Sequence, residues 1–382
     1  MIDFSFTPEQ EQLRRQIIAL AQQTLNDEVV ERDREQRFDR DKWEAAGQLK
    51  LQGLAIPEAY GGHGLDIIST MHALEALGYG CRDNGLSFAI GAHLLACVVP
   101  LWLYGSEDQK QRLLPALCNG QYIAANAITE ATSGSDVYNM SSLGKPVEGG
   151  YQLSGEKHYC SNASVADYFL AYVLTNPAKG AIGGISAFLL EKAEVEVLPP
   201  VDKMGMRSVM MSALRFEDLH KGPDNMLGQE GAGMMIFNQS MIWERIGLSI
   251  LHLGTLQRLL EECIAFVKKR KAFGQAIAQF QSINHQMADI ATAINAARWS
   301  TYHAAWCLQQ DKMADRQAAM VKLMVSELYK KTCGELLQIY GTAGYINNSE
   351  IERNLRDAVA STLYSGTSRV QRNKIARWLK IG

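Results

Sequence analysis

The chain has 382 residues, enough for two or three domains of typical size. Its formal net charge of −3 argues against a protein that coats DNA or RNA, because such proteins need clustered basic surface. Hydrophobic residues make up 47% and charged residues 21%, which excludes a disordered chain and predicts a globular one.

Residues 1–121 are predicted to form a helical domain. Thr7 and Ser106 each open a capping-box pattern, and leucines and isoleucines follow at helical spacing. The run from Asn84 to Ser106 contains no Asp, Glu, Lys or Arg and is long enough to span a bilayer. Because the run also holds polar residues, a proline and three glycines, we expect a buried core helix rather than a membrane span.

The pattern changes at residue 122 and again at residue 230. Short apolar runs such as YFLAYVL and SAFLL, separated by glycine-rich connections, predict a β-domain over 122–229. Helical periodicity then returns and continues over 230–382. The sequence therefore predicts an α+β chain of three domains, in the order helices, sheet, helices.

Short motifs do not assign a chemistry. The eight histidines form no metal-ligand spacing, so no metal site is expected, and there is no Walker loop or GxSxG elbow. The seven cysteines include no CxxC pair, and the N-terminus has no signal-peptide pattern. We therefore expect a cytoplasmic protein with reduced thiols.

Longer segments, in order along the whole chain, resemble the acyl-CoA dehydrogenase flavoprotein family. AITEATSGSD (127–136) resembles A-[ILVM]-T-E-P-x-A-G-S-D, and GEKHYCSN (155–162) resembles G-x-K-x-W-I-T-N. RKAFG (270–274) with Gln281, QIYGTAGY (338–345) and RD (356–357) with GTS (366–368) resemble the later signatures. Each match alone is weak, but together they carry the resemblance.

The resemblance implies a fold, a cofactor and an assembly. The family fold has an N-terminal helical domain, a middle β-domain and a C-terminal four-helix bundle. FAD would lie between the last two domains, and the chain would form a homotetramer in which two subunits share each flavin site.

The resemblance also implies which residues hold FAD, with hydroxyls and glycine backbone near the flavin and an arginine near the pyrophosphate. Tyr159 stands where the family has tryptophan. The residues expected from one subunit are Ile128, Thr129, Gly134, Ser135, Tyr159, Ser161 and Thr367. Those expected from a neighbouring subunit are Arg270, Phe273, Gln281, Gln338 and Gly341.

The catalytic base is not at its usual place. In many members the glutamate of Y-E-G-T removes the α-proton, but here the motif reads YSGT and Ser365 is too weakly basic. Only the backbone N–H of Ser365 remains for the thioester oxyanion. Glu244, in WER (243–245), matches the alternative base position of isovaleryl-type members. The alternative is that Glu244 and Arg245 form only an ion pair.

Within the family, CRDNGL (81–86) and the features above most resemble dehydrogenases and oxidases of carrier-bound proline, including those of anatoxin-type biosynthesis. This implies oxidation of a phosphopantetheinyl-bound prolyl thioester to a pyrroline thioester in secondary metabolism. The carrier protein would be the partner, and dioxygen or an electron-transfer protein would reoxidise FAD.

Three alternatives remain from the sequence. One is an acyl-CoA dehydrogenase of fatty-acid or branched-chain degradation. Another is a flavin monooxygenase on the same fold, suggested by the missing Y-E-G-T glutamate. The third is a non-catalytic DNA-associated flavoprotein, which the net charge of −3 disfavours.

Overall fold

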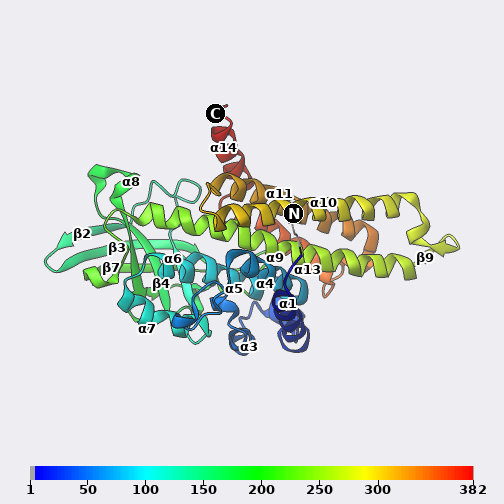
Figure 1. The fold of residues 1–382 in the computed structure, drawn as a ribbon, viewed down its shortest axis with the longest axis horizontal. Helices are drawn as coiled ribbons and strands as arrows, with labels where there is room; N and C mark the ends of the chain where they lie inside the picture. The colour runs from blue at the N-terminus through cyan, green and yellow to red at the C-terminus, as the bar shows by residue number, and fades with distance from the viewer. Residues whose placement is uncertain (1–4, 382) are drawn as a thin grey trace.

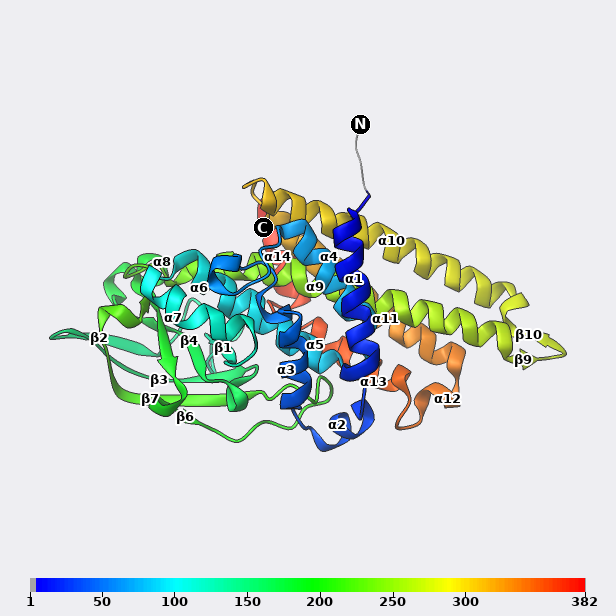
Figure 2. The ribbon, with the colours of Figure 1, turned by 60° about the horizontal axis from the view of Figure 1, so that its bottom comes forward.

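The computed structural model describes residues 5–381 and divides into a sheet at one end and long helices at the other (Figure 1). The first part is helical, and its helices pack beside the long helices of the last part (Figure 2). Its helices are α1 (Pro8–Leu20), α2 (Val29–Glu35), α3 (Arg40–Gln48), α4 (Ile67–Gly80), α5 (Asn84–His93), α6 (Val99–Tyr104) and α7 (Glu107–Cys118).

The middle part forms one eight-stranded sheet among the described residues. The hydrogen-bonded order is β6-β7-β3-β2-β4-β5-β8, and β1 pairs in parallel with β4. A short α8 (Ala181–Gly184) precedes β5. The strands are β1 (Ala124–Ala127), β2 (Leu143–Val147), β3 (Gly150–Cys160), β4 (Tyr168–Leu174), β5 (Ile185–Glu191), β6 (Glu196–Val197), β7 (Ser212–Lys221) and β8 (Met226–Leu227).

The last part is built around three long helices that run side by side (Figure 1). A small hairpin of β9 (Lys271–Ala272) and β10 (Gln275–Ala276) joins the first two at the end far from the sheet. The helices are α9 (Gly233–Lys269), α10 (Gln281–Gln309), α11 (Asp315–Tyr340), α12 (Thr342–Tyr345), α13 (Glu350–Ser361) and α14 (Ser368–Trp378).

The uncharged run of the first part lies inside the protein. It forms α5, a π-helical turn over Leu94–Val98, and α6. Within Asn84–Tyr104, 83% of the most apolar window is buried, and α9 packs against it. The run is therefore a buried core helix, as expected. The capping boxes at Thr7 and Ser106 are also confirmed.

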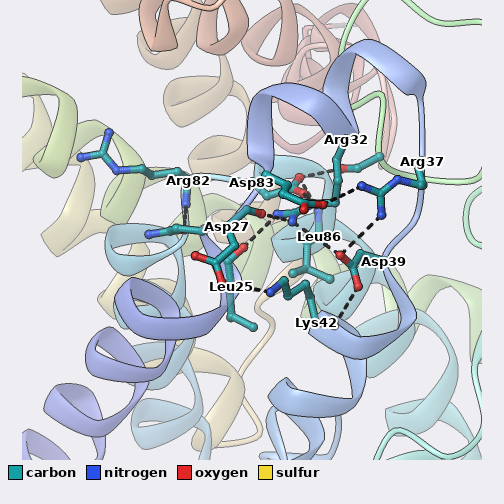
Figure 3. Close-up of polar contacts among 12 residues, drawn as sticks. Leu25, Asp27, Arg32, Arg37, Asp39, Lys42, Arg82, Asp83 and Leu86 are labelled. Carbon is teal, nitrogen blue, oxygen red and sulfur yellow. Dashed lines mark hydrogen bonds and ion pairs between the residues drawn. The ribbon is translucent and has the colours of Figure 1, made fainter.

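A buried polar contact ties α2 to the start of α5. The Arg32 Nε donates to Asp83 Oδ2 at 3.0 Å, and a second Arg32 nitrogen donates to the Leu25 carbonyl at 2.8 Å (Figure 3). Asp83 also caps α5 by accepting from the Leu86 N–H at 3.0 Å. Arg32 is 1% exposed, so this pairing fixes the CRDNGL segment in place.

Candidate active site

A cavity of about 640 Å³ opens between the sheet and the C-terminal helices, a size typical of cofactor and substrate sites. Its walls come from β1, the loop after β1, β3, α9 and the segment between α13 and α14. Nine residues predicted from the sequence line it: Ile128, Thr129, Gly134, Ser135, Tyr159, Ser161, Glu244, Ser365 and Thr367.

The loop that carries Gly134 and Ser135 is anchored at both ends by Glu130. The Glu130 carboxylate accepts hydrogen bonds from the backbone N–H groups of Ser141 and Ser142, at 2.6 and 2.9 Å, and from both hydroxyls. Lys157 Nζ lies 2.8 Å from the same carboxylate. Burial opposes ionisation, but Lys157 and the serines outweigh it and hold the pKa of Glu130 at about 2.

The cavity wall has the groups that a flavin requires. A Cβ built on Gly134 would meet no atom within 4 Å, so a ligand has room to approach this backbone closely. The Tyr159 side chain is 59% exposed at the end of β3, which leaves an aromatic face toward the cavity. Thr129, Ser135 and Ser161, which carry hydroxyl groups, line the same cavity. These residues fit FAD.

Thr367 has a second role that the sequence did not reveal. Its side chain accepts a hydrogen bond from the Val370 N–H at 3.2 Å and so caps α14. It also lines the cavity. The threonine therefore fixes the start of α14 at the cavity wall.

Glu244 and Ser365 meet at the cavity. The Ser365 hydroxyl donates a short hydrogen bond to the Glu244 carboxylate, although the two residues lie 121 positions apart. Because α9 begins at Gly233, Glu244 lies inside the helix. Its backbone is therefore held on both sides by helical hydrogen bonds.

The environment of Glu244 suits a base. The residue is 7% exposed, and burial raises the pKa of its carboxyl. The Ser365 hydroxyl, the Arg245 guanidinium and the Lys322 ammonium oppose that rise. The net direction brings the pKa of the carboxyl nearer to neutral pH, where a base must work.

The backbone of Ser365 is held from two directions. Arg245 Nε donates to the Ser365 carbonyl at 3.1 Å, and Gln371 Nε2 donates to the carbonyls of Ser365 and Gly366 at 3.0 and 2.9 Å. Ser365 has a φ of +53°, a conformation that is uncommon outside glycine. Its N–H donates no hydrogen bond to any residue in 5–381. That donor is therefore free to meet a ligand.

Arg245 does not pair with its neighbour Glu244. It pairs with Asp315 on α11 at 3.1 Å, and Lys374 of α14 approaches the same carboxylate at 2.8 Å. The two adjacent residues therefore have different contacts. Glu244 lines the cavity, whereas Arg245 joins α9 to the Ser365 backbone and to α11. In the sequence, only the adjacency of Glu244 and Arg245 is visible. No sequence pattern indicates that Gln371 contacts Ser365.

The CRDNGL segment supports another part of the cavity wall. Asn84 Nδ2 donates to Asp357 Oδ2 at 2.8 Å, and Asp357 Oδ1 accepts from the backbone N–H of Met206 at 2.5 Å. The Ser208 hydroxyl donates to Asp83 at 2.6 Å. Met206 lines the cavity. Residues 81–86 therefore position the wall without lining the cavity themselves.

Five expected FAD residues lie elsewhere in the same chain. All five are exposed, and Phe273 is 96% exposed at the tip of the β9–β10 hairpin. They gather where α9 ends, α10 begins and α11 ends, which is the end of the molecule opposite the sheet (Figures 1 and 2). They are Arg270, Phe273, Gln281, Gln338 and Gly341. They do not line the cavity of their own chain.

Three family models match the chain along most of its length. They are the N-terminal domain of acyl-CoA dehydrogenase over residues 7–121, the middle domain over 125–219 and the C-terminal domain over 231–380. The chain belongs to the acyl-CoA dehydrogenase family. The expected fold class is thereby confirmed.

Individual relatives and solved structures are similar to the chain over nearly its whole length. An L-prolyl-[peptidyl-carrier protein] dehydrogenase from a Serratia species is 36% identical over 380 residues, covering 99% of this chain and 98% of that protein. The crystal structure of the prolyl acyl carrier protein oxidase AnaB is 40% identical, with a TM-score of 0.96 and coverage of 98% and 100%. PigA with FAD and proline is 36% identical, with a TM-score of 0.96 and full coverage of both chains.

The enzyme class and the cofactor follow from this membership. The chain is an FAD-dependent oxidoreductase of the acyl-CoA dehydrogenase family, as the sequence predicted. Among the described residues, no group of three or more His, Cys, Asp or Glu is placed to hold a metal ion.

Proposed function

We propose that this enzyme oxidises a prolyl group, held as a thioester on a carrier protein, to a pyrroline thioester. The observation that carries the proposal is the buried Glu244 carboxylate, held by Ser365 at a cavity whose flavin-side residues match the family motifs. The relatives named for carrier-bound proline support the substrate class.

The chain's residues divide the reaction between them. The Glu244 carboxylate takes the proton from the α-carbon of the prolyl group as the β-carbon loses hydride. FAD, when bound, supplies the hydride acceptor. The unsaturated thioester that forms is an enamine, and proton transfer from nitrogen to carbon converts it to the pyrroline.

Charge that develops on the thioester oxygen needs a donor. The Ser365 N–H has no partner within 5–381 and is fixed through its neighbouring carbonyl by Arg245 and Gln371. A preorganised donor stabilises the enolate-like transition state because it requires no reorganisation during the reaction. The serine therefore serves through its backbone, and its hydroxyl orients the base.

We propose further that the enzyme works as a homotetramer. The five exposed residues at the far end of the bundle support this, because they match FAD motifs but lie away from the cavity of their own chain. In an assembly, they would complete the flavin site of a neighbouring subunit. A cytoplasmic location and a place in secondary metabolism stay predictions.

The deciding experiment mixes the yellow holoenzyme, without oxygen, with a carrier protein loaded with proline. Rapid bleaching of the flavin absorption is expected, and the same carrier carrying only its free phosphopantetheine thiol should give none. Recovery of the absorption on admitting air would mark an oxidase, whereas recovery only with an electron-transfer protein would mark a dehydrogenase. Bleaching by acyl-CoA esters but not by the prolyl carrier would overturn the proposed substrate.

A further inference from the structure

A second, much smaller cavity lies behind the Tyr364–Ser365 segment. Its volume is about 10 Å³, room for about one water molecule. It shares Arg245, Tyr364 and Ser365 with the large cavity, so these residues form a partition between the two. The remaining wall comes from α9, α11 and the end of α13.

The ammonium group of Lys322 is buried at this small cavity. The residue is on α11 and is 4% exposed, and its Nζ has no hydrogen-bond or ion-pair partner among residues 5–381. A buried lysine without an acceptor is costly, because its charge loses hydration and gains nothing in return. Such a group calls for an explanation beyond packing.

The charged and titratable groups around Lys322 come from three elements. Arg245 and His252 approach from α9, Tyr364 from the segment after α13, and Glu327 lies further along α11. His252 Nε2 makes a short hydrogen bond with the Tyr364 hydroxyl, and its Nδ1 has no partner among the described residues. Burial, and then the charge of Lys322, lower the pKa of His252 to about 3, so it is neutral at working pH.

We propose that Lys322 is a positioning residue of the reaction: from behind Ser365, its ammonium group stabilises the carboxylate form of Glu244 without touching the substrate. This inference rests on the proposed function, in which Glu244 is the base. Arg245 also lies beside Glu244, but its guanidinium forms an ion pair with Asp315, which it shares with Lys374. Lys322, by contrast, has no carboxylate of residues 5–381 within ion-pair distance.

The electrostatic coupling runs in both directions. Lys322 is among the groups that oppose the burial-driven rise in the pKa of Glu244. Burial, and then the charge of Arg245, lower the pKa of Lys322 to about 7, while the charges of Glu327 and then Glu244 work against that fall. Near neutral pH the ammonium is therefore partly charged, and its charge favours a base that is ready to accept a proton.

The test compares three substitutions on the same helix by anaerobic flavin bleaching with the prolyl carrier from pH 5.5 to 9.5. Lys322→Met removes the charge, Lys322→Arg keeps it at all these pH values, and Lys331→Met removes an exposed lysine as the matched control. We expect the rate profile of Lys322→Met to move up by about one pH unit, with roughly tenfold slower bleaching on its acid side and recovery at high pH. Lys322→Arg should keep the acid side of the wild-type profile, because the lysine is already charged there, and Lys331→Met should leave the profile unchanged.

A structural role would give a different pattern. If Lys322→Met were slower by one constant factor at every pH, or had the wild-type profile, the proposal would be overturned. Glu244→Gln separates the two hypotheses. Full activity in that variant removes the proposed base, whereas an inactive Glu244→Gln with an unshifted Lys322→Met profile overturns the role of Lys322 alone.

A second measurement does not depend on turnover. The protonated carboxyl of Glu244 gives an infrared carbonyl band that is identified by its loss in Glu244→Gln. Titration of this band in the holoenzyme should show a higher midpoint in Lys322→Gln than in wild type. An equal midpoint would overturn the proposal. Lys322→Gln serves here because a shorter polar side chain is less disruptive if the methionine variant fails to fold.

Discussion

The Ser365 hydroxyl donates a hydrogen bond to the Glu244 carboxylate, so the residue at the family's usual base position contacts the residue proposed to replace it. A glutamate at position 365 would place two carboxyl groups at this point. Serine removes the competing charge and keeps a hydrogen-bond donor for the proposed base. Serine at position 365 and glutamate at position 244 are therefore structurally linked, because each contacts the other.

Glu244→Gln should fold, stay yellow and lose flavin reduction by at least about a thousandfold, because the amide cannot accept the α-proton. Stopped-flow bleaching with the prolyl carrier measures the loss. Glu261→Gln, on the exposed side of the same helix, is the matched control. Reduction of Glu244→Gln at the wild-type rate would exclude it as base.

Ser365→Ala should raise the pKa of Glu244, the proposed base, and leave that base in place. The Ser365 hydroxyl helps to lower the pKa of Glu244, so its loss raises that pKa. The carboxyl is then protonated over a wider acid range. A lost hydrogen bond of about 1 kcal/mol predicts reduction several-fold slower at neutral pH and near the wild-type rate at pH 9. A rate–pH profile identical to wild type would contradict this role of the hydroxyl.

Glu130→Gln should weaken FAD binding and lower stability. The substitution leaves the Lys157 ammonium buried without its carboxylate, which costs about 3–5 kcal/mol. The loop with Gly134 and Ser135 also loses charged acceptors at its end. FAD content after dialysis and thermal unfolding measure both effects. Glu148→Gln, exposed in the turn between β2 and β3, should change neither.

Asp357 makes stability depend on pH. Burial raises its pKa from the ordinary 3.8 to about 6, despite hydrogen bonds from Asn84 and Met206. Since the folded protein holds this proton more tightly than the unfolded chain, the free energy of unfolding falls as pH rises from about 4 to 6. The decline is roughly 3 kcal/mol for this group.

Asp357→Asn should remove that decline. Urea unfolding of the holoenzyme between pH 4 and 7 gives the comparison. The stability difference between wild type and variant should change across this range and become constant above it. A difference that stays the same at every pH would show that Asp357 does not titrate there.

Mixing two inactive variants tests the shared flavin site. Arg270→Ala should lose FAD and Glu244→Gln should lose the base, so each homo-oligomer is inactive. If Arg270 serves a neighbouring subunit, mixed assemblies contain sites with both intact residues, and activity should return after co-refolding. Activity that stays absent in verified mixed assemblies would place Arg270 in the site of its own chain or outside any site.

The sequence predicted the fold and nine residues of the cavity wall. Periodicity indicated the order of helices and sheet, the wall residues came from motifs that resemble the family, and the role of Glu244 as base stays a prediction. Ile128 to Ser135 share one segment, and Glu244 stands beside a recognisable arginine. It did not predict the support of Ser365 by Gln371, since that contact depends on how α14 leaves the preceding turn. It could not predict Lys322, whose significance comes from burial and not from its neighbours in sequence.

The buried run from α5 to α6 also has a consequence for synthesis. It packs against α9, which ends at Lys269, 165 residues after Tyr104. At ~5–20 residues per second, a ribosome needs roughly 10–30 s to make that stretch. During this interval the nascent chain carries an apolar helix without its covering partner. A chain that terminates before α9 would keep that surface open and aggregate, so the N-terminal helices depend for their solubility on a segment made much later.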